Sequence, residues 1–232
     1  PGPCPAGKFP VTEPPIEPPR FLPAPEERAR LREKLVQIAG AAFDAPIILL
    51  NPNCGDVLPV RRWPTGNYMA LAREILDRQK TATIFCIGLA CDRDAVAEMC
   101  KSVDPTRMFS LAGETTFREL LTLYSLADVL VSADSGPPHF AAMTGISTVV
   151  LFGPETPKLF GPLGNKVRVL TANFACSPCV TPLNQRIPPC NDNACMAAIG
   201  VESVLDAVEE SLALRGNALD RIDLTGQLRQ HS

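Results

Sequence analysis

The sequence has no long apolar run. Stretches such as Pro46 to Leu50 and Thr148 to Phe152 have the length of a core strand and are far too short to span a bilayer. Neither sign of charge dominates, because 22 lysines and arginines stand against 25 acidic residues, for a formal net charge of −3. This balance excludes a broad attraction to nucleic acid or to an acidic membrane, so we expect no nucleic-acid partner and at most peripheral membrane contact.

The chain also opens without the charged and apolar segments of a secretion signal. Cysteine, by contrast, is plentiful, but the nine cysteines are an odd number. Five of them are scattered through the first half of the chain: Cys4, Cys54, Cys86, Cys91 and Cys100. An odd, scattered set suits a reducing cytosol better than a complete disulfide framework, so we expect a cytoplasmic protein.

Proline dominates the first 25 residues, where the pairs Pro14-Pro15 and Pro18-Pro19 favour extended structure. We interpret residues 1–25 as a linker. A helical pattern with acidic side chains at its start follows within residues 26–45. Residues 46–215 are interpreted as one domain that includes a cysteine-rich loop at residues 174–196, and residues 216–232 as a C-terminal tail.

From residue 46 onward, short apolar runs alternate with amphipathic helical patterns. The predicted strands are residues 47–51, 83–88, 108–111, 129–133, 148–152 and 167–171, and the predicted helices are residues 65–78, 92–102, 116–126, 136–144 and 201–212. Thr65 is the expected cap of the first of these helices, and Thr116 to Glu119 has the form of a capping box. The fold class is therefore α/β, a Rossmann-like parallel sheet with helices on both faces. Such sheets bind ligands at the carboxyl ends of their strands.

The segment Asp134-Ser135-Gly136-Pro137-Pro138-His139 follows a predicted strand and opens a predicted helix. Gly136 lets the backbone approach a ligand closely, Pro137 suits a first helical turn, and free N–H groups there can hold phosphate. The side chains of Asp134, Ser135 and His139 can hydrogen-bond to a phosphate or a sugar hydroxyl. A purely structural helix start would show the same local pattern.

The chain continues as Phe140-Ala141-Ala142-Met143-Thr144-Gly145 and then as Val149-Val150-Leu151-Phe152-Gly153-Pro154. With Asp134 to His139, these segments resemble the signature of glycosyltransferase family nine, the ADP-heptose:lipopolysaccharide heptosyltransferases and their relatives. The resemblance covers about residues 25–212. It implies the C-terminal half of a GT-B glycosyltransferase, with residues 26–45 as the interdomain helix and a nucleotide-diphosphate sugar, ADP-heptose, as the ligand.

Arg61-Arg62-Trp63-Pro64 is a second match to that family. Its members usually carry Lys two residues before this Trp, where the Lys meets the donor diphosphate. Arg61 keeps the charge, but its planar guanidinium replaces a compact ammonium. The resemblance implies that Arg61 and Asn53, in the loop after the first strand, bind the donor. The alternative for Arg61 and Arg62 is a solvated basic pair, and we expect Trp63 to pack against the helix start.

Asp92 follows the predicted strand 83–88, where similar enzymes place an acidic residue that accepts from ribose hydroxyls. The alternative is that Asp92 caps the next helix. By analogy, Thr115 lies beside the base. The expected donor-binding set is therefore Asn53, Arg61, Asp92, Thr115, Asp134, Ser135, Gly136, Pro137 and His139.

Cys176, Cys179, Cys190 and Cys195 stand in a loop rich in proline and asparagine. Four thiolates at this spacing could hold a structural zinc ion in a tetrahedral site with no open position. Free thiols and disulfides are the alternatives. Family members often carry a similar loop that ends in Cys-Met, but the resemblance does not imply a bound metal.

The resemblance implies transfer of a sugar from the ADP-sugar to a lipopolysaccharide-core or other glycan acceptor. The reaction requires no cofactor if Arg61 and the helix end stabilise the departing diphosphate. The acceptor and the general base are expected on an N-terminal acceptor domain, which nothing in residues 1–25 resembles, so the catalytic base is unknown. The expected location is cytoplasmic, or at the inner face of the inner membrane. The alternatives are a non-catalytic nucleotide-sugar-binding or interaction module and a fragment of a GT-B-type sugar epimerase.

Overall fold

The computed structural model describes residues 17–219 except 41, 44, 45, 57, 185, 186, 189 and 191. Most of the predicted linker and of the predicted tail, residues 1–16 and 220–232, lies outside the described residues. The helix expected within residues 26–45 is α1, Pro25–Ala39. No helix in the described part of the chain is long and apolar enough to cross a membrane.

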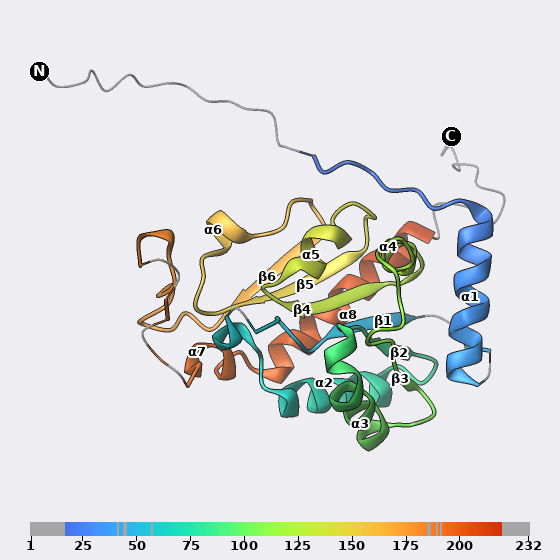
Figure 1. Cartoon of the computed structure of the whole chain (residues 1–232), viewed down its shortest axis with the longest axis horizontal. Coiled ribbons are helices and arrows are strands. Elements are labelled where there is room, and N and C mark those ends of the chain that lie inside the picture. The colour runs from blue at the N-terminus through green and yellow to red at the C-terminus, as the bar shows by residue number, and fades with distance from the viewer. Residues whose placement is uncertain are drawn as a thin grey trace, which may run out of the picture.

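Six parallel strands form one sheet in the order β3-β2-β1-β4-β5-β6 (Figure 1). The strands are β1 (Ile47–Asn51), β2 (Thr83–Cys86), β3 (Met108–Ser110), β4 (Val129–Ala133), β5 (Ser147–Phe152) and β6 (Val167–Thr171). The chain moves outward from β1 to β3 and then crosses back to place β4 on the other side of β1. This reversal of strand order opens a crevice at the carboxyl ends of β1 and β4, where open α/β sheets bind their ligands.

Helices cover both faces of the sheet. The longer ones are α1 (Pro25–Ala39), α2 (Thr65–Arg78), α3 (Arg93–Val103), α4 (Phe117–Leu126), α5 (Gly136–Ala141) and α8 (Val201–Leu219). The short elements are α6 (Pro157–Phe160), α7 (Ala194–Ala197) and the 3-10 turns η1 (Pro59–Arg61), η2 (Ala90–Asp92) and η3 (Pro182–Asn184). One buried cluster joins the sheet to α2, α3 and α8, and a second joins it to α1, α4 and α5. The predicted fold class is thus confirmed.

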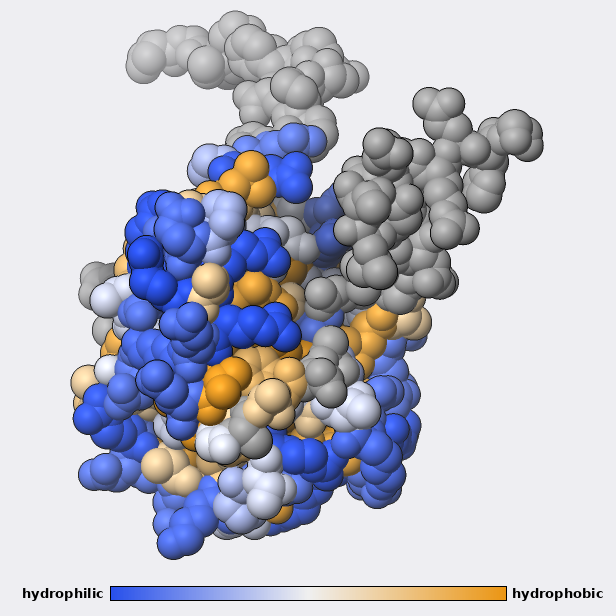
Figure 2. Space-filling view, turned by 90° about the vertical axis from the view of Figure 1, so that its right-hand side faces the viewer, coloured by the Kyte–Doolittle hydropathy of each residue, from blue (hydrophilic) through white to orange (hydrophobic). Residues whose placement is uncertain are grey.

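Burial follows from the strand sequences. Every residue of β1, β2 and β4 is buried, as a parallel sheet between two helix layers requires. The outer surface is different: on the face shown in Figure 2, hydrophilic residues cover most of the molecule and apolar residues form smaller groups between them.

The predicted capping box at α4 is confirmed. The Glu119 N–H donates to the Thr116 hydroxyl at 3.2 Å, and the Thr116 N–H donates to the Glu119 carboxylate at 2.8 Å. The prediction that Thr65 caps α2 is wrong, because Thr65 is the first helical residue and Pro64 holds the cap position. The Pro64 carbonyl accepts from the Asn67 N–H at 2.9 Å, and proline offers no side-chain cap.

Candidate functional site at the carboxyl edge of the sheet

A pocket of about 250 Å³ lies at the carboxyl ends of β1 and β2 and the start of α5. Its lining residues are Asn51, Asn53, Cys54, Gly55, Ile87, Gly88, Leu89, Asp92, Thr115, Leu120, Ser135, Gly136 and Pro137. Six of the nine residues predicted from the sequence are among them: Asn53, Asp92, Thr115, Ser135, Gly136 and Pro137. The fold therefore brings together side chains that are as far apart in the sequence as Asn53 and Pro137.

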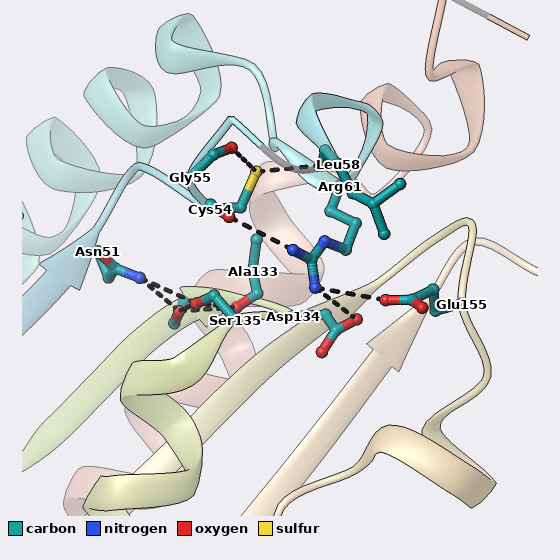
Figure 3. A network of polar contacts seen from close by, with 10 residues as sticks. Asn51, Cys54, Gly55, Leu58, Arg61, Ala133, Asp134, Ser135 and Glu155 are labelled. Carbon is teal, nitrogen blue, oxygen red and sulfur yellow. Dashed lines mark hydrogen bonds and ion pairs between the residues drawn. The ribbon is translucent and has the colours of Figure 1, made fainter. Parts of the chain in front are cut away.

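The floor of this pocket depends on the pairing of β1 with β4. Asn51 ends β1, and its Nδ2 donates to the Ser132 hydroxyl at 2.9 Å and to the Ser135 hydroxyl at 3.2 Å (Figure 3). The Ser135 hydroxyl in turn donates to the Ala133 carbonyl at 3.0 Å. Ser135 stands at the cap position of α5, but its side chain makes no cap hydrogen bond. These contacts hold the start of α5 against the end of β1.

The start of α5 has fewer donors than an ordinary helix N-terminus. Gly136 has an N–H group, but Pro137 and Pro138 have none. The sequence predicted that free N–H groups at this helix start hold a phosphate. Only the N–H groups on either side of the two prolines, those of Gly136 and His139, are present to do so. Hydroxyl and amide side chains such as Ser135 and Asn53 supply the other polar groups in the lining.

Asp92 belongs to the turn η2 and lines the pocket. Its carboxylate accepts from the Leu89 N–H at 2.8 Å. Asp92 occupies the cap position of α3, yet its side chain makes no cap hydrogen bond there. The alternative prediction of a helix N-cap thus holds for the position of Asp92 but not for a side-chain cap, because the carboxylate closes the loop after β2 instead.

Thr115 reaches the same pocket from the loop after β3. Gly113 joins this loop to the one after β2, since its N–H donates to the Gly88 carbonyl at 3.0 Å. Gly113 has φ of +71°, and a Cβ at this position would lie 2.7 Å from the Ala90 Cα, so only glycine fits. The close approach of the two loops forms the wall that contains Asp92 and Thr115.

Arg61 does not line the pocket but lies directly behind it, in a buried ion-pair cluster. Its Nη1 is 3.3 Å from Glu155 Oε2 and 3.6 Å from Asp134 Oδ2, and its Nη2 donates to the Cys54 carbonyl at 3.4 Å (Figure 3). Asp134 and Glu155 are only 5% and 1% exposed. The alternative that Arg61 is a solvated basic side chain is wrong, because two buried carboxylates match its charge.

The environment of this cluster changes the acidity of Asp134. Burial and contact with the Glu155 carboxyl group together raise the pKa of Asp134 to about 7, although the Arg61 guanidinium opposes the shift. Sequence reasoning missed Glu155. The signal that could have found it is an acidic residue directly after the strand end Phe152-Gly153-Pro154, at the edge where the other predicted residues lie.

His139 and the remaining residues of the Arg-Arg-Trp motif lie elsewhere. His139 is exposed on α5, outside the described lining of the pocket, and partial burial lowers its pKa. Arg62 pairs with the exposed Asp56 at 3.7 Å. Trp63 is fully buried, and its Nε1 donates to the Ile199 carbonyl at 3.0 Å. Its ring also meets that of Tyr68, in the first turn of α2, so the prediction that Trp63 packs against the helix start is confirmed.

The cysteine-rich loop packs on the turn after β5. The N–H groups of Cys179 and Val180 donate to the Pro154 carbonyl at 2.9 and 2.8 Å, and the Ser177 hydroxyl donates to the Gly153 carbonyl. A Cβ at Gly153 would lie 2.9 Å from the Cys195 sulfur. The loop thus supports the segment that carries Glu155.

The four thiols of this loop are near one another. Burial raises the pKa of Cys179 and of Cys195, and the neighbouring thiols raise both further. None of the eight described cysteines is in a disulfide. Within the described residues, however, no group of three or more His, Cys, Asp or Glu side chains is arranged to hold a metal ion.

A second cavity, of about 660 Å³, lies at the amino ends of β4, β5 and β6, between α4 and α8. Its lining includes Tyr124, Asp128, Lys166, Arg168 and Glu210. None of the predicted donor-binding residues lines it, so the motifs converge on the opposite edge of the sheet.

Comparison with known proteins agrees with this geometry. The sequence profile of "Glycosyltransferase family 9 (heptosyltransferase)" matches residues 15–186. The chain is 32% identical over 115 residues to "Lipopolysaccharide heptosyltransferase 2" of Escherichia coli strain K12, which covers 48% of this chain and 32% of that relative. It is 27% identical over 159 residues to "Lipooligosaccharide heptosyltransferase 2" of Haemophilus influenzae, which covers 67% of this chain and 45% of that relative. The chain thus spans less than half the length of these two relatives.

Solved structures share the fold. The structure titled "Structure of E. coli ADP-heptose lps heptosyltransferase II" aligns with a TM-score of 0.70 and 22% identity over 85% of this chain and 54% of that one. The glycosyl transferase family 9 protein from Veillonella parvula aligns with a TM-score of 0.66 and 21% identity over 84% of this chain and 54% of that one. The fold is that of the corresponding half of a GT-B enzyme, as the sequence predicts. Because the family profile spans well over half of the residues, this chain belongs to glycosyltransferase family 9, the heptosyltransferase family.

Proposed function

We propose that this chain is the donor-binding domain of a heptosyltransferase-type glycosyltransferase and that the pocket at the carboxyl edge binds a nucleotide-diphosphate sugar, ADP-heptose. One observation carries the proposal: six of the nine residues chosen from sequence patterns line a single pocket at the strand-order reversal of the sheet. The names of the relatives, lipopolysaccharide and lipooligosaccharide heptosyltransferases, support the choice of donor.

The lining suggests how the donor would lie. Asp92 and Thr115 stand together on the wall formed by the loops after β2 and β3, where a carboxylate can accept from ribose hydroxyls. Asn53, Ser135 and Gly136 stand at the ends of β1 and β4, where amide, hydroxyl and backbone N–H donors can hold the diphosphate. We propose that Arg61, which lies behind this second group, supports the leaving diphosphate only in part, because Asp134 and Glu155 offset its charge. The hydroxyl, amide and backbone N–H donors of the lining stabilise the diphosphate without requiring a metal at the pocket.

Transfer also needs an acceptor and a general base. We propose that both come from an N-terminal acceptor domain and that the acceptor is a lipopolysaccharide core or a related glycan. We place the reaction in the cytoplasm, at the inner face of the inner membrane, because an odd and scattered set of cysteines favours a reducing compartment.

Titration calorimetry with ADP-glucose tests the donor site. Asp92→Asn removes a charge that lines the pocket, whereas Asp94→Asn removes the same charge from the exposed face of α3, two residues away. We expect Asp92→Asn to weaken binding by about 10-fold or more, the worth of a charge-assisted hydrogen bond, and Asp94→Asn to leave it unchanged. Equal affinities for wild type and Asp92→Asn would refute the assignment of the pocket.

The gene that encodes the chain separates the enzyme from its alternatives. A second Rossmann-like half encoded upstream would support the transferase. An unrelated domain there would support a non-catalytic nucleotide-sugar-binding module instead.

A further inference from the structure

The wall of the pocket that contains Thr115 is held from outside by α1. Lys34, in the second half of α1, reaches the loop after β3, where its Nζ donates to the Glu114 carbonyl at 2.5 Å and to the Glu119 carboxylate at 2.9 Å. Thr115, which follows Glu114, lines the pocket. Leu120, which follows Glu119, lines it as well. One ammonium group thus contacts the chain next to two residues of the lining.

The contact at Glu114 fixes a whole peptide plane. A carbonyl oxygen and the N–H group of the next residue belong to the same planar unit, so a donor that holds the oxygen also sets the direction of the N–H. Because Lys34 holds the Glu114 carbonyl, it also orients the backbone N–H of Thr115. The direction in which the chain enters the pocket wall is therefore set from α1.

The contact at Glu119 ties the first turn of α4 to α1. One oxygen of this carboxylate, Oε2, accepts from the Thr116 N–H in the capping box, and the other, Oε1, accepts from Lys34. The two oxygens have separate partners, so Lys34 adds to the cap and does not compete with it. The turn that contains Leu120 is thus held both by its own cap and by α1.

A second cation holds the same loop from α3. Arg93 pairs with the Glu114 carboxylate at 2.9 Å, and its Nη2 donates to the Gly113 carbonyl at 3.3 Å. The side chain of Glu114 is therefore held from α3 and its carbonyl from α1. Arg93 directly follows Asp92 and so belongs to the wall itself, whereas none of the described lining residues comes from α1. Lys34 is the contact through which a separate element reaches this wall.

The position of Lys34 does not depend on its own contacts. Leu31 and Leu35, on either side of it in α1, are only 2% and 1% exposed and pack in the cluster that joins α1 and α4 to the sheet. Nearer the start of α1, Glu27 pairs with Arg118 of α4. These contacts keep α1 against α4 (Figure 1), so replacing Lys34 should leave the helix in place and release only the loop.

We propose that Lys34 is a positioning residue of the donor pocket: it holds the peptide between Glu114 and Thr115 and the first turn of α4 so that this wall receives the nucleoside end of the donor. Lys34 lies outside the described lining and acts through Thr115 and Leu120. The inference rests on the proposed function of the same pocket. It predicts a loss confined to ligands that carry a nucleoside, because the groups proposed to hold the diphosphate stand at the ends of β1 and β4.

Titration calorimetry of Lys34→Met, which keeps an unbranched side chain and removes its charge, tests this role. The affinity for ADP-glucose should fall by about three- to tenfold, the worth of an exposed charged hydrogen bond and its ion pair. The affinity for inorganic pyrophosphate, measured by displacement of ADP-glucose, should stay within about twofold of wild type. Lys101→Met is the matched control, because it removes the same charge from an exposed side chain in the last turn of α3 and should change neither affinity.

A second readout needs no ligand. The carbonyl carbon-13 resonance of Glu114 and the amide resonance of Thr115 should both move in Lys34→Met, because that variant removes the donor to this carbonyl. Both resonances should stay in place in Lys101→Met. A change of resonance at this peptide, in a chain that keeps its circular dichroism, reports the loop and not the stability of the whole fold.

Glu119→Gln is the second variant should Lys34→Met fail to fold. Its amide oxygen can still accept from the Thr116 N–H, but the charge that binds Lys34 is gone, so the same selective loss is expected. Unchanged resonances of Glu114 and Thr115, or equal affinities of variant and wild type for ADP-glucose, would overturn the positioning role and leave the donor site intact. An equal loss of affinity for pyrophosphate would overturn it as well. If wild type did not bind ADP-glucose, the proposed function would itself fail, and the inference with it.

Discussion

Trp63 provides a direct test of whether a motif residue serves packing or ligand binding. Its indole is fully buried, meets Tyr68 in a T-shaped contact with ring centroids 4.8 Å apart, and donates from Nε1 to the Ile199 carbonyl at 3.0 Å. Trp63→Phe keeps an aromatic ring but removes the donor and part of the volume. A buried carbonyl left without its donor and a partly filled site should together lower the free energy of unfolding by about 2–4 kcal/mol.

Urea denaturation followed by circular dichroism measures this change, because the variant lacks the only tryptophan of the sequence and its fluorescence cannot be used. The domain should remain folded, since its total stability is of the order of 5–15 kcal/mol. Leu22→Ala, at a side chain that is 71% exposed, is the control and should change the stability by less than about 0.5 kcal/mol. The affinity of Trp63→Phe for ADP-glucose should stay within about a factor of two of wild type. A large loss of affinity in a protein of unchanged stability would refute the packing role.

Three further predictions concern other parts of the chain. Thr116→Ala removes the cap of α4 and should lower the free energy of unfolding by about 1 kcal/mol, measured by thermal denaturation; an unchanged midpoint would contradict the cap. The cysteine-rich loop should act as a local structural clip rather than a redox centre, and elemental analysis with thiol counting on anaerobically purified protein decides it. Four freely reactive thiols without bound metal would rule out the clip. Finally, the chain alone should bind donor but not transfer sugar, because positioning of an acceptor supplies about 7–11 kcal/mol of the barrier reduction. Turnover of about one per second or faster with ADP-heptose and a lipopolysaccharide core would disprove this.

Several elements could be predicted from the sequence residue by residue. The bounds of β1, α2, β4 and β6 agree with the prediction, because apolar runs of five residues and a period of 3.6 are local signals that burial reinforces. The edge of the sheet that holds the pocket was also predictable, since parallel strands place all their carboxyl ends on one side. The bounds of elements whose ends depend on distant contacts were predicted less accurately. For example, the predicted helix 136–144 ends at Ala141, where the chain turns toward Gly145, which has φ of +76°.

The fold class, the family and the loops that line the pocket follow from the sequence alone, because they depend on local periodicity and on a motif that is contiguous in the chain. The contacts of the charged side chains became visible only in the folded chain. Arg61 and Glu155 are 94 residues apart and meet because β1 and β5 flank β4 in the sheet. Tertiary packing also leaves His139 exposed on α5 and outside the lining of the pocket, whereas the contact of the Asp92 carboxylate with the Leu89 N–H is local. Charge pairing depends on distances of a few ångströms and on burial, and neither is encoded in the local spacing of residues.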